Sequence, residues 1–141
     1  MMTFPDAVKT CLAKYATFSG RATRSEYWFF VLFAFLVLLG ASILDNVLDV
    51  VVFAPVLEGN ILAGAVVLAL LLPQIAVAVR RLHDMNHSGW WYLIGLVPAA
   101  GGIILVIWFC FEGTRGENRF GPDPFAFEAD WAPEIDRHDN T

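Results

Sequence analysis

Long stretches of this 141-residue sequence contain no charged residue. These stretches are residues 27–44, 61–79 and 90–111, and they are 18, 19 and 22 residues long. Across the chain 16% of residues are charged and 57% are hydrophobic, whereas soluble domains average roughly 25% charged residues. Because a membrane-spanning helix needs about 20 apolar residues, this lack of charge argues against a soluble core and predicts an all-α integral membrane protein with about three transmembrane helices.

Cysteine and clustered positive charge are also scarce. The two cysteines, Cys11 and Cys110, belong to no CxxC pair, so we predict no disulfide, redox function or cofactor. Nucleic-acid binding would need a clustered basic surface, and nucleic acid is not an expected partner.

The net charge of −5 comes from residues 112–141, which hold eight acidic and three basic residues. The remainder of the chain holds six of each. We therefore expect a membrane domain at 1–124 and an acidic, flexible tail at 125–141.

The start of the chain predicts a short interfacial helix at residues 4–18. Apolar side chains recur there at helical spacing, namely Phe4, Val8, Cys11, Leu12, Tyr15 and Phe18. Lys9 and Lys14 lie off this apolar stripe. A basic amphipathic helix of this kind lies in the headgroup plane of a membrane, and it can also pack against the spanning helices from the surface.

A first spanning helix is expected at about residues 25–46. Thr23 and Glu26 precede the apolar run with the spacing of a capping box, in which Thr accepts from a backbone N–H one turn in and Glu reaches back. Tyr27 and Trp28 stand where interfacial aromatic anchors belong. These signals place the beginning of the helix near Arg24.

Two acidic residues follow this apolar run. Asp45 and Asp49 are four residues apart, and the helix either ends before them or continues past them. We expect two solvated carboxylates in a short outer loop, because an acid inside the membrane is costly. Pro55, Gly59 and Asn60 then supply turn chemistry.

A second spanning helix is expected at 61–80, with a kink at Pro73. Proline has no N–H to donate to the carbonyl of Ala69. A backbone carbonyl freed inside a membrane must find another partner. The neighbouring Gln74 is the side chain that we expect to meet this demand or to bond to another helix.

The third apolar segment, at 89–111, fits two structures. Trp90 and Trp91 begin it as interface anchors, and its middle holds the helix breakers Pro98, Gly101 and Gly102. One structure is a kinked span, because the 22 uncharged residues at 90–111 rise about 33 Å. The other is a re-entrant hairpin with two short arms. We favour the kinked span, since Pro and Gly are tolerated in spanning helices. A motif-bearing turn region follows at 113–124.

The basic residues predict the orientation. They are Lys9, Lys14, Arg21 and Arg24 before the first span, Arg80 and Arg81 after the second, and Arg115 and Arg119 after the third segment. No Lys or Arg occurs in residues 45–60. The positive-inside rule therefore puts the N-terminus and residues 80–89 in the cytoplasm. With the favoured three spans we expect the C-terminus outside, in the periplasm, whereas a hairpin would place it inside.

Three blocks, separated by apolar segments, carry a family resemblance. They are "FSGRATRSEYW" at 18–28, "RRLHDMNHSGWW" at 80–91 and "GTRGENRFGPDP" at 113–124. Their order and spacing resemble the YhaH-like small bacterial inner-membrane proteins, domain of unknown function 805, over residues 4–124. The resemblance implies a multi-pass protein of the bacterial inner membrane, and it implies no activity.

The favoured function is a non-enzymatic scaffold, regulator or lipid-interacting envelope protein. We expect a network of charges and a histidine at the cytoplasmic headgroup level, formed by Arg21, Arg24, Glu26, Arg80, Arg81, His83 and Asp84. In this network Asp84 holds Arg21 or Arg24 and locks the helix ends together. Anionic lipid headgroups are the expected partners, because anionic lipid attracts such basic residues; a homo-oligomer and an unidentified protein partner are also expected.

Two other functions fit parts of the sequence. An oligomeric small transporter or channel would use the breaks near Pro73 and Pro98 as elements of a substrate site, but no charged residue lies in mid-helix. A membrane metalloenzyme would use His83, Asp84 and His87, because H-x-x-x-H on a helix can bind zinc. That motif lacks a third protein ligand nearby, so we predict neither a metal site nor an enzyme.

Overall fold

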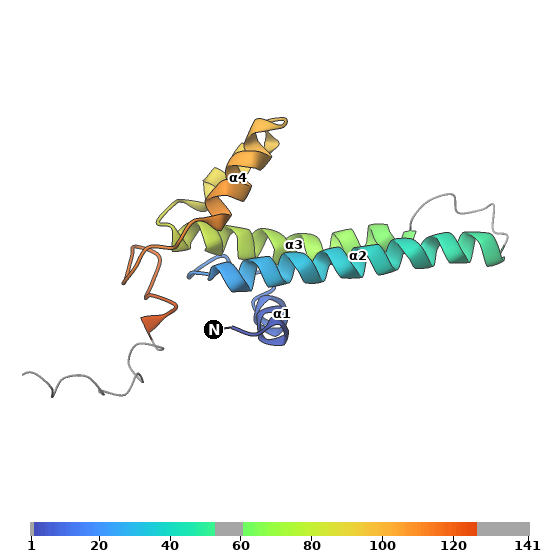
Figure 1. The fold of residues 1–141 in the computed structure, drawn as a ribbon, viewed down its shortest axis with the longest axis horizontal. Helices are drawn as coiled ribbons and strands as arrows, with labels where there is room; N and C mark the ends of the chain where they lie inside the picture. The colour runs from blue at the N-terminus through green and yellow to red at the C-terminus, as the bar shows by residue number, and fades with distance from the viewer. Residues whose placement is uncertain (1, 53–60, 127–141) are drawn as a thin grey trace, which may run out of the picture.

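The computed structural model of the protein describes residues 2–52 and 61–126. Its helices are α1 (Phe4–Ala13), α2 (Arg24–Val52), α3 (Ile61–Asp84), the 3-10 helix η1 (Gly89–Leu96) and α4 (Ala100–Cys110), as Figure 1 shows. The expected turn at Pro55, Gly59 and Asn60 and the tail beyond residue 126 lie outside the described residues.

α2 and α3 run side by side in opposite directions and form the long axis of the molecule (Figure 1). The stretches Arg24–Leu48 and Ile61–Asp84 are each long and apolar enough to cross a membrane, by length and composition. α2 begins at the predicted residue, because Thr23 Oγ1 accepts a hydrogen bond from the Glu26 backbone N–H at 3.1 Å. This bond satisfies one of the free donors in the first helical turn.

Asp45 does not lie where we expected it. It is part of α2 and is buried, and its carboxylate accepts hydrogen bonds from the backbone N–H groups of Leu62 at 3.0 Å and Ala63 at 2.8 Å. The expectation of a solvated loop carboxylate is therefore wrong for Asp45. The first N–H groups of a helix lack intrahelical acceptors, so Asp45 caps α3 and ties it to α2. The side chain of Asp49 lies outside the described residues.

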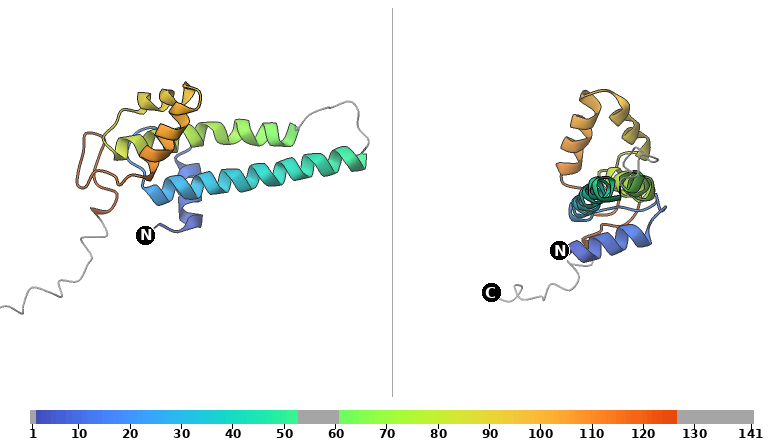
Figure 2. Two further views of the ribbon diagram at one scale, coloured as in Figure 1. Left: turned by 45° about the horizontal axis from the view of Figure 1, so that its top comes forward. Right: turned by 90° about the vertical axis from the view of Figure 1, so that its right-hand side faces the viewer.

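α1 lies across the α2–α3 pair, near the end where α2 begins (Figure 2). It is shorter than the helix predicted at 4–18, and its residues Ala7 and Cys11 are fully buried. The position of α1 therefore agrees with an amphipathic helix that packs its apolar face on a helix pair.

Pro73 lies inside α3, and the helix continues through it from Ile61 to Asp84. The Ala69 carbonyl, which Pro73 leaves without its helical donor, accepts a hydrogen bond from the Tyr15 hydroxyl. Gln74 does not take this role, and its Oε1 is buried without a partner in the part of the chain that the structure describes. Tyr15 thus fastens the segment after α1 to the middle of α3.

The third apolar segment folds as a helical hairpin, so the favoured kinked span over 89–111 is not formed. η1 and α4 pack against each other (Figure 1), and Ala99 in the turn between them takes a positive φ of 61°. The two arms approach closely at Gly101, where a Cβ would overlap the carbonyl oxygen of Ile94. The breakers at 98–102 therefore act as a turn, which was the second of the two predicted structures.

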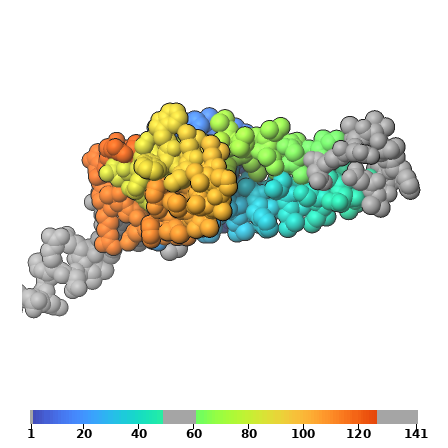
Figure 3. All heavy atoms as spheres, turned by 90° about the horizontal axis from the view of Figure 1, so that it is seen from above, coloured from blue at the N-terminus to red at the C-terminus, as the bar shows by residue number. Residues whose placement is uncertain are grey.

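The hydrophobic core lies where α1 and the hairpin meet the α2–α3 pair. Its buried members are Cys11, Ala22, Tyr27, Phe30, Val77, Ala78, Leu82, Leu105 and Phe109. Tyr27 packs on Phe109 with ring centroids 4.4 Å apart, so it is a core residue, and its role as an interface anchor stays a prediction. Figure 3 shows the hairpin over one end of the pair, with the rest of the described part of the pair left uncovered on this face.

Candidate charge centre

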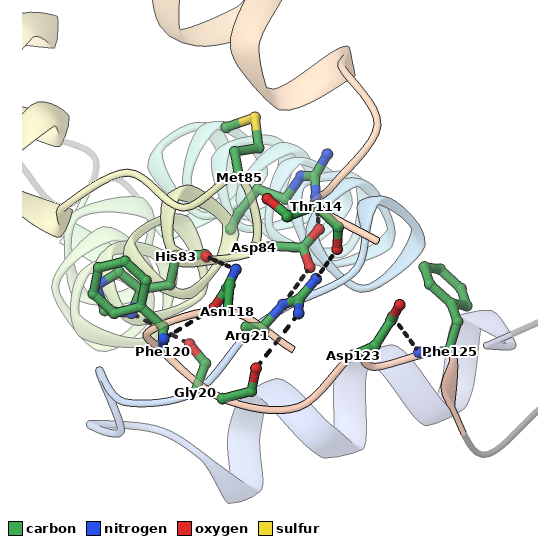
Figure 4. Close-up of polar contacts among 12 residues, drawn as sticks. Gly20, Arg21, His83, Asp84, Met85, Thr114, Asn118, Phe120, Asp123 and Phe125 are labelled. Carbon is green, nitrogen blue, oxygen red and sulfur yellow. Dashed lines mark hydrogen bonds and ion pairs between the residues drawn. The ribbon is translucent and has the colours of Figure 1, made fainter. Parts of the chain in front are cut away.

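Asp84, the last residue of α3, lies between two arginines. Its Oδ1 accepts a hydrogen bond from Arg21 Nε at 3.0 Å, and its Oδ2 accepts one from the Arg81 guanidinium (Figure 4). The side chains of Asp84 and Arg21 are each 2% exposed, and that of Arg81 is fully buried. Buried charges must be paired and hydrogen-bonded to be tolerated, and one carboxylate here serves two guanidinium groups.

The Arg21 guanidinium also binds the loop that follows α4. Its Nη1 donates to the carbonyl of Gly116 at 2.5 Å, and its Nη2 donates to that of Thr114. The Thr114 N–H in turn donates to the main-chain carbonyl of Asp84 at 2.8 Å. A Cβ on Gly113 would overlap the Asp84 carboxylate, so a glycine is needed for this approach. Arg21 therefore joins the segment before α2 to the loop after α4.

Arg81 joins the same centre to the end of α4. Its Nη2 donates to the carbonyls of Phe111 and, at 3.4 Å, Phe109. The last carbonyls of a helix have no intrahelical donor, so Arg81 satisfies groups that would otherwise be buried and unpaired. Its Nε is buried without a partner among the described residues.

A second buried ion pair connects α2 to α3. Arg80 Nη1 lies 2.5 Å from Glu26 Oε1, with side chains 0% and 4% exposed. The Glu26 carboxylate therefore pairs with Arg80. In a capping box it would instead accept a hydrogen bond from the backbone N–H of Thr23. Cys11 Sγ lies 3.7 Å from the same Glu26 oxygen. Burial, helped by the charge of Glu26, raises the pKa of the Cys11 thiol to about 12.

His83 contacts the loop after α4 and does not touch the ion pairs. Its ring stacks on Phe120, with centroids 3.9 Å apart and planes 4° apart (Figure 4). Its Nδ1 lies 3.2 Å from the carbonyl of Gly20, and its main-chain carbonyl accepts from Asn118 Nδ2 at 2.9 Å. Sequence reasoning missed Phe120 and Asn118; their one signal was their place in the block at 113–124.

His87 lies apart from His83. Its Nδ1 is 2.8 Å from the carbonyl of Met85, and its ring packs on Trp108 with centroids 5.0 Å apart. Asp84 is already held by two arginines. Over residues 2–52 and 61–126, no three His, Cys, Asp or Glu side chains gather in a way that could hold a metal ion. The three residues of the zinc hypothesis therefore have separate contacts.

A cavity of about 210 Å³ opens beside Asp84. The charged residues that line it are Arg21, Arg24, Arg81, Arg115, Asp84, Glu112 and Asp123. Arg24 was one expected partner of Asp84, but its Nη1 donates to the carbonyl of Cys110 at 3.4 Å. Arg24 thus stands at the edge of the centre.

Asp123 shapes the loop on the other side of this cavity. Its carboxylate accepts hydrogen bonds from the backbone N–H groups of Phe125 at 2.9 Å and Gly116 at 2.7 Å. These two bonds lower the pKa of Asp123, because they favour the charged form. The carboxylate is therefore used to hold the loop and stays ionised at neutral pH.

The predicted tryptophan anchors differ in exposure. Trp90 is 80% exposed and Trp91 50% exposed. Trp91 meets Trp108 edge to face at 5.6 Å. Trp28 is partly buried and packs against the core. Trp90 and Trp91 thus have the exposure that an interface anchor needs, while Trp28 also supports the core.

Two long apolar helices, an amphipathic helix across one of their ends and buried ion pairs at that same end define a small helical membrane protein. The chain belongs to the family described as "Protein of unknown function (DUF805)", whose model matches residues 15–122. The membership predicted from the three sequence blocks is confirmed.

Relatives support the same membership. Inner membrane protein YhaI of Escherichia coli (strain K12) is 46% identical over 113 residues, which cover 80% of this chain and 90% of that protein. Inner membrane protein YhaH of the same organism is 41% identical over 113 residues, or 80% and 91% of the two chains. Uncharacterized protein YiiR is 29% identical over 134 residues, or 76% and 85%. No solved structure matches the chain.

Proposed function

We propose that this protein is a non-enzymatic scaffold or regulator of the bacterial inner membrane whose charged end binds anionic lipid headgroups at the cytoplasmic face. Two relatives are named as inner membrane proteins. The observation that carries the proposal is the gathering of Arg21, Arg80 and Arg81 in buried ion pairs at one end of α2 and α3, while residues 27–44 and 61–79 hold no charge at all.

The proposal gives each helix a place in the bilayer. α2 and α3 cross it, and α1 lies in the headgroup plane, because it runs across the spanning pair near the charged end and is amphipathic. The positive-inside rule puts this end in the cytoplasm. The N-terminal segment and the loop at 113–124 are then both cytoplasmic, because Arg21 binds that loop.

The hairpin then enters and leaves the cytoplasmic leaflet. η1 has 8 residues and α4 has 11, and each arm rises about 16 Å, roughly half of the 30 Å hydrocarbon core. The side chains of Trp90 and Leu96 are each 80% exposed and that of Ile103 is 61% exposed. These lengths and exposures suit a re-entrant element whose outer surface meets acyl chains.

Lipid binding by this end has a simple electrostatic basis. Each Lys or Arg near an anionic membrane surface contributes about 1 kcal/mol of attraction. The buried ion pairs keep the arginines in one layer, and α1 adds Lys9 beside that layer, where the side chain is exposed. The bound lipid is therefore expected to be held by charge at one face.

Native mass spectrometry in detergent tests this proposal. Phosphatidylglycerol and phosphatidylcholine with the same acyl chains are titrated separately, so that only the headgroup charge differs. We expect more retained phosphatidylglycerol, and a preference that declines as salt is added. Equal retention of the two lipids at low salt would overturn the proposal.

A further inference from the structure

We infer that the cavity beside Asp84 is a binding site for a phosphate group, held between Arg24 and Arg115 over the buried Arg81. The inference deepens the proposed function and rests on it, since an anionic lipid is one source of such a group. The cavity measures about 210 Å³, well above the roughly 10–15 Å³ that one water molecule needs. It therefore has room for a tetrahedral headgroup.

The balance of charge in this cavity favours an anion. Its lining has four arginines and three carboxylates, which leaves a formal charge of +1. Asp84 is the one carboxylate that pairs with both Arg21 and Arg81. The buried part of the lining therefore carries the excess positive charge. A net positive charge beside a buried guanidinium group attracts an anion, because the effective dielectric constant near a protein surface is lower than that of bulk water.

The exposed arginines of the cavity remain available as hydrogen-bond donors. Arg81 is fully buried, and its Nε has no partner among the described residues. Arg24 makes one long bond of 3.4 Å to a carbonyl, and within the described ranges no carboxylate lies within ion-pair distance of it. Arg115 meets Glu112 only at the surface, at 3.5 Å with side chains 87% and 63% exposed. An incoming anion can therefore recruit Arg24 and Arg115 without breaking a buried pair.

Phosphate is the anion whose chemistry fits best. The guanidinium group offers a planar fork of N–H donors that matches two phosphate oxygens. α2 begins at Arg24, so the positive end of its helix dipole adds to the same field. Phe125, which lines the cavity, is 50% exposed, and it provides an apolar surface for the chain of a phosphate ester.

The test compares the double variant Arg24→Gln/Arg115→Gln with Arg119→Gln. All three arginines are exposed, so their removal leaves the core intact. Arg119 is the matched control, because it lies in the same loop as Arg115 but bonds to the Asn86 carbonyl and does not line the cavity. Each protein is titrated with phosphatidylglycerol and phosphatidylcholine by native mass spectrometry, and separately with inorganic phosphate against chloride by thermal unfolding at equal ionic strength.

We expect the double variant to lose about tenfold in affinity for phosphatidylglycerol, which corresponds to about 1.4 kcal/mol, while Arg119→Gln changes it by less than about twofold. If the parent prefers phosphatidylglycerol and the double variant keeps that preference, the cavity inference is overturned and the proposed function stands. If inorganic phosphate alone binds the parent and the double variant loses it, the site is supported with free phosphate as its ligand, and the proposed function fails. Absence of binding in both arms overturns both.

Discussion

The Arg21 guanidinium lies 3.0 Å from the Asp84 carboxylate, although 63 residues separate them in the chain. Both side chains are 2% exposed. A buried ion pair adds little net stability, but removal of one partner leaves the other charge buried and uncompensated. The pair therefore acts mainly as a constraint on which segments can meet, and Asp84 is the residue on which the centre depends.

Asp84→Asn keeps the shape of the side chain and removes its charge, so Arg21 and Arg81 stay buried without a counter-ion. We expect the free energy of unfolding to fall by about 3–5 kcal/mol, the usual cost of breaking a buried pair. Chemical unfolding in detergent micelles, followed by tryptophan fluorescence, measures it. Glu112→Gln is the matched control, because its ion pair is exposed, and it should stay within about 1 kcal/mol of the parent. A variant at Asp84 as stable as the parent would contradict the role given to this residue.

Gly113→Ala introduces a Cβ where the Asp84 carboxylate lies. Forced overpacking costs about 1–3 kcal/mol, so we expect a lower melting temperature in a thermal shift assay. Gly102→Ala is the control. A Cβ on Gly102, inside α4, meets nothing within 4 Å, and Ala is better than Gly inside a helix by about 0.5–1 kcal/mol. Similar melting temperatures for the two variants would show that the close contact is not needed.

Much of the fold could be predicted from charge and periodicity. The uncharged runs identified α2 and α3, and the stripe of apolar residues identified α1, because both signals depend on local sequence alone. The hairpin could not be chosen over a kinked span, since Pro98 and the glycines that follow suit both. The hairpin is distinguished from the kinked span by the contact of Arg81 with the carbonyls at the end of α4. This is a tertiary contact between distant segments, which local sequence patterns do not reveal.

The candidate site was predicted in part for the same reason. Placing the basic residues in one membrane layer predicted that Asp84 pairs with Arg21 or Arg24, and the structure contains the pair with Arg21. It could not assign Glu26 to Arg80, because several carboxylates and arginines share that layer. The sequence did not predict the cap on α3 by Asp45 either, since it depends on how the start of α3 packs beside α2.

Tyr15→Phe removes the hydroxyl that bonds to the Ala69 carbonyl. We expect a loss of about 1 kcal/mol in the free energy of unfolding, typical of one hydrogen bond. Pro73→Ala restores the backbone N–H that, in an ordinary helix, donates a hydrogen bond to the Ala69 carbonyl. In a double-mutant cycle, Tyr15→Phe should therefore cost less when residue 73 is alanine. Additive effects of the two changes would show that Tyr15 does not replace the missing donor.

The Cys11 thiol should be unreactive in the folded protein. Its pKa is raised from the ordinary 9.0 to about 12, so the reactive thiolate is rare at pH 8. A Cys110→Ser protein, which retains only Cys11, should react with N-ethylmaleimide only after unfolding. Because the raised pKa favours the protonated thiol in the fold, its contribution to stability is complete below pH 9 and declines as pH rises towards 12. Rapid labelling of the native protein at pH 8 would be inconsistent with the burial of Cys11.

In the proposed topology, the segments before α2 and after α4 meet at one face of the membrane. Lys9→Cys and Glu117→Cys, each in the Cys110→Ser background, place exposed thiols on these two segments. A membrane-impermeant maleimide is applied to intact spheroplasts and to inverted membrane vesicles. We predict that both positions are labelled in the vesicles and that neither is labelled in the spheroplasts. Labelling of Glu117→Cys from outside, with Lys9→Cys labelled only from inside, would contradict the hairpin and restore the three-span arrangement.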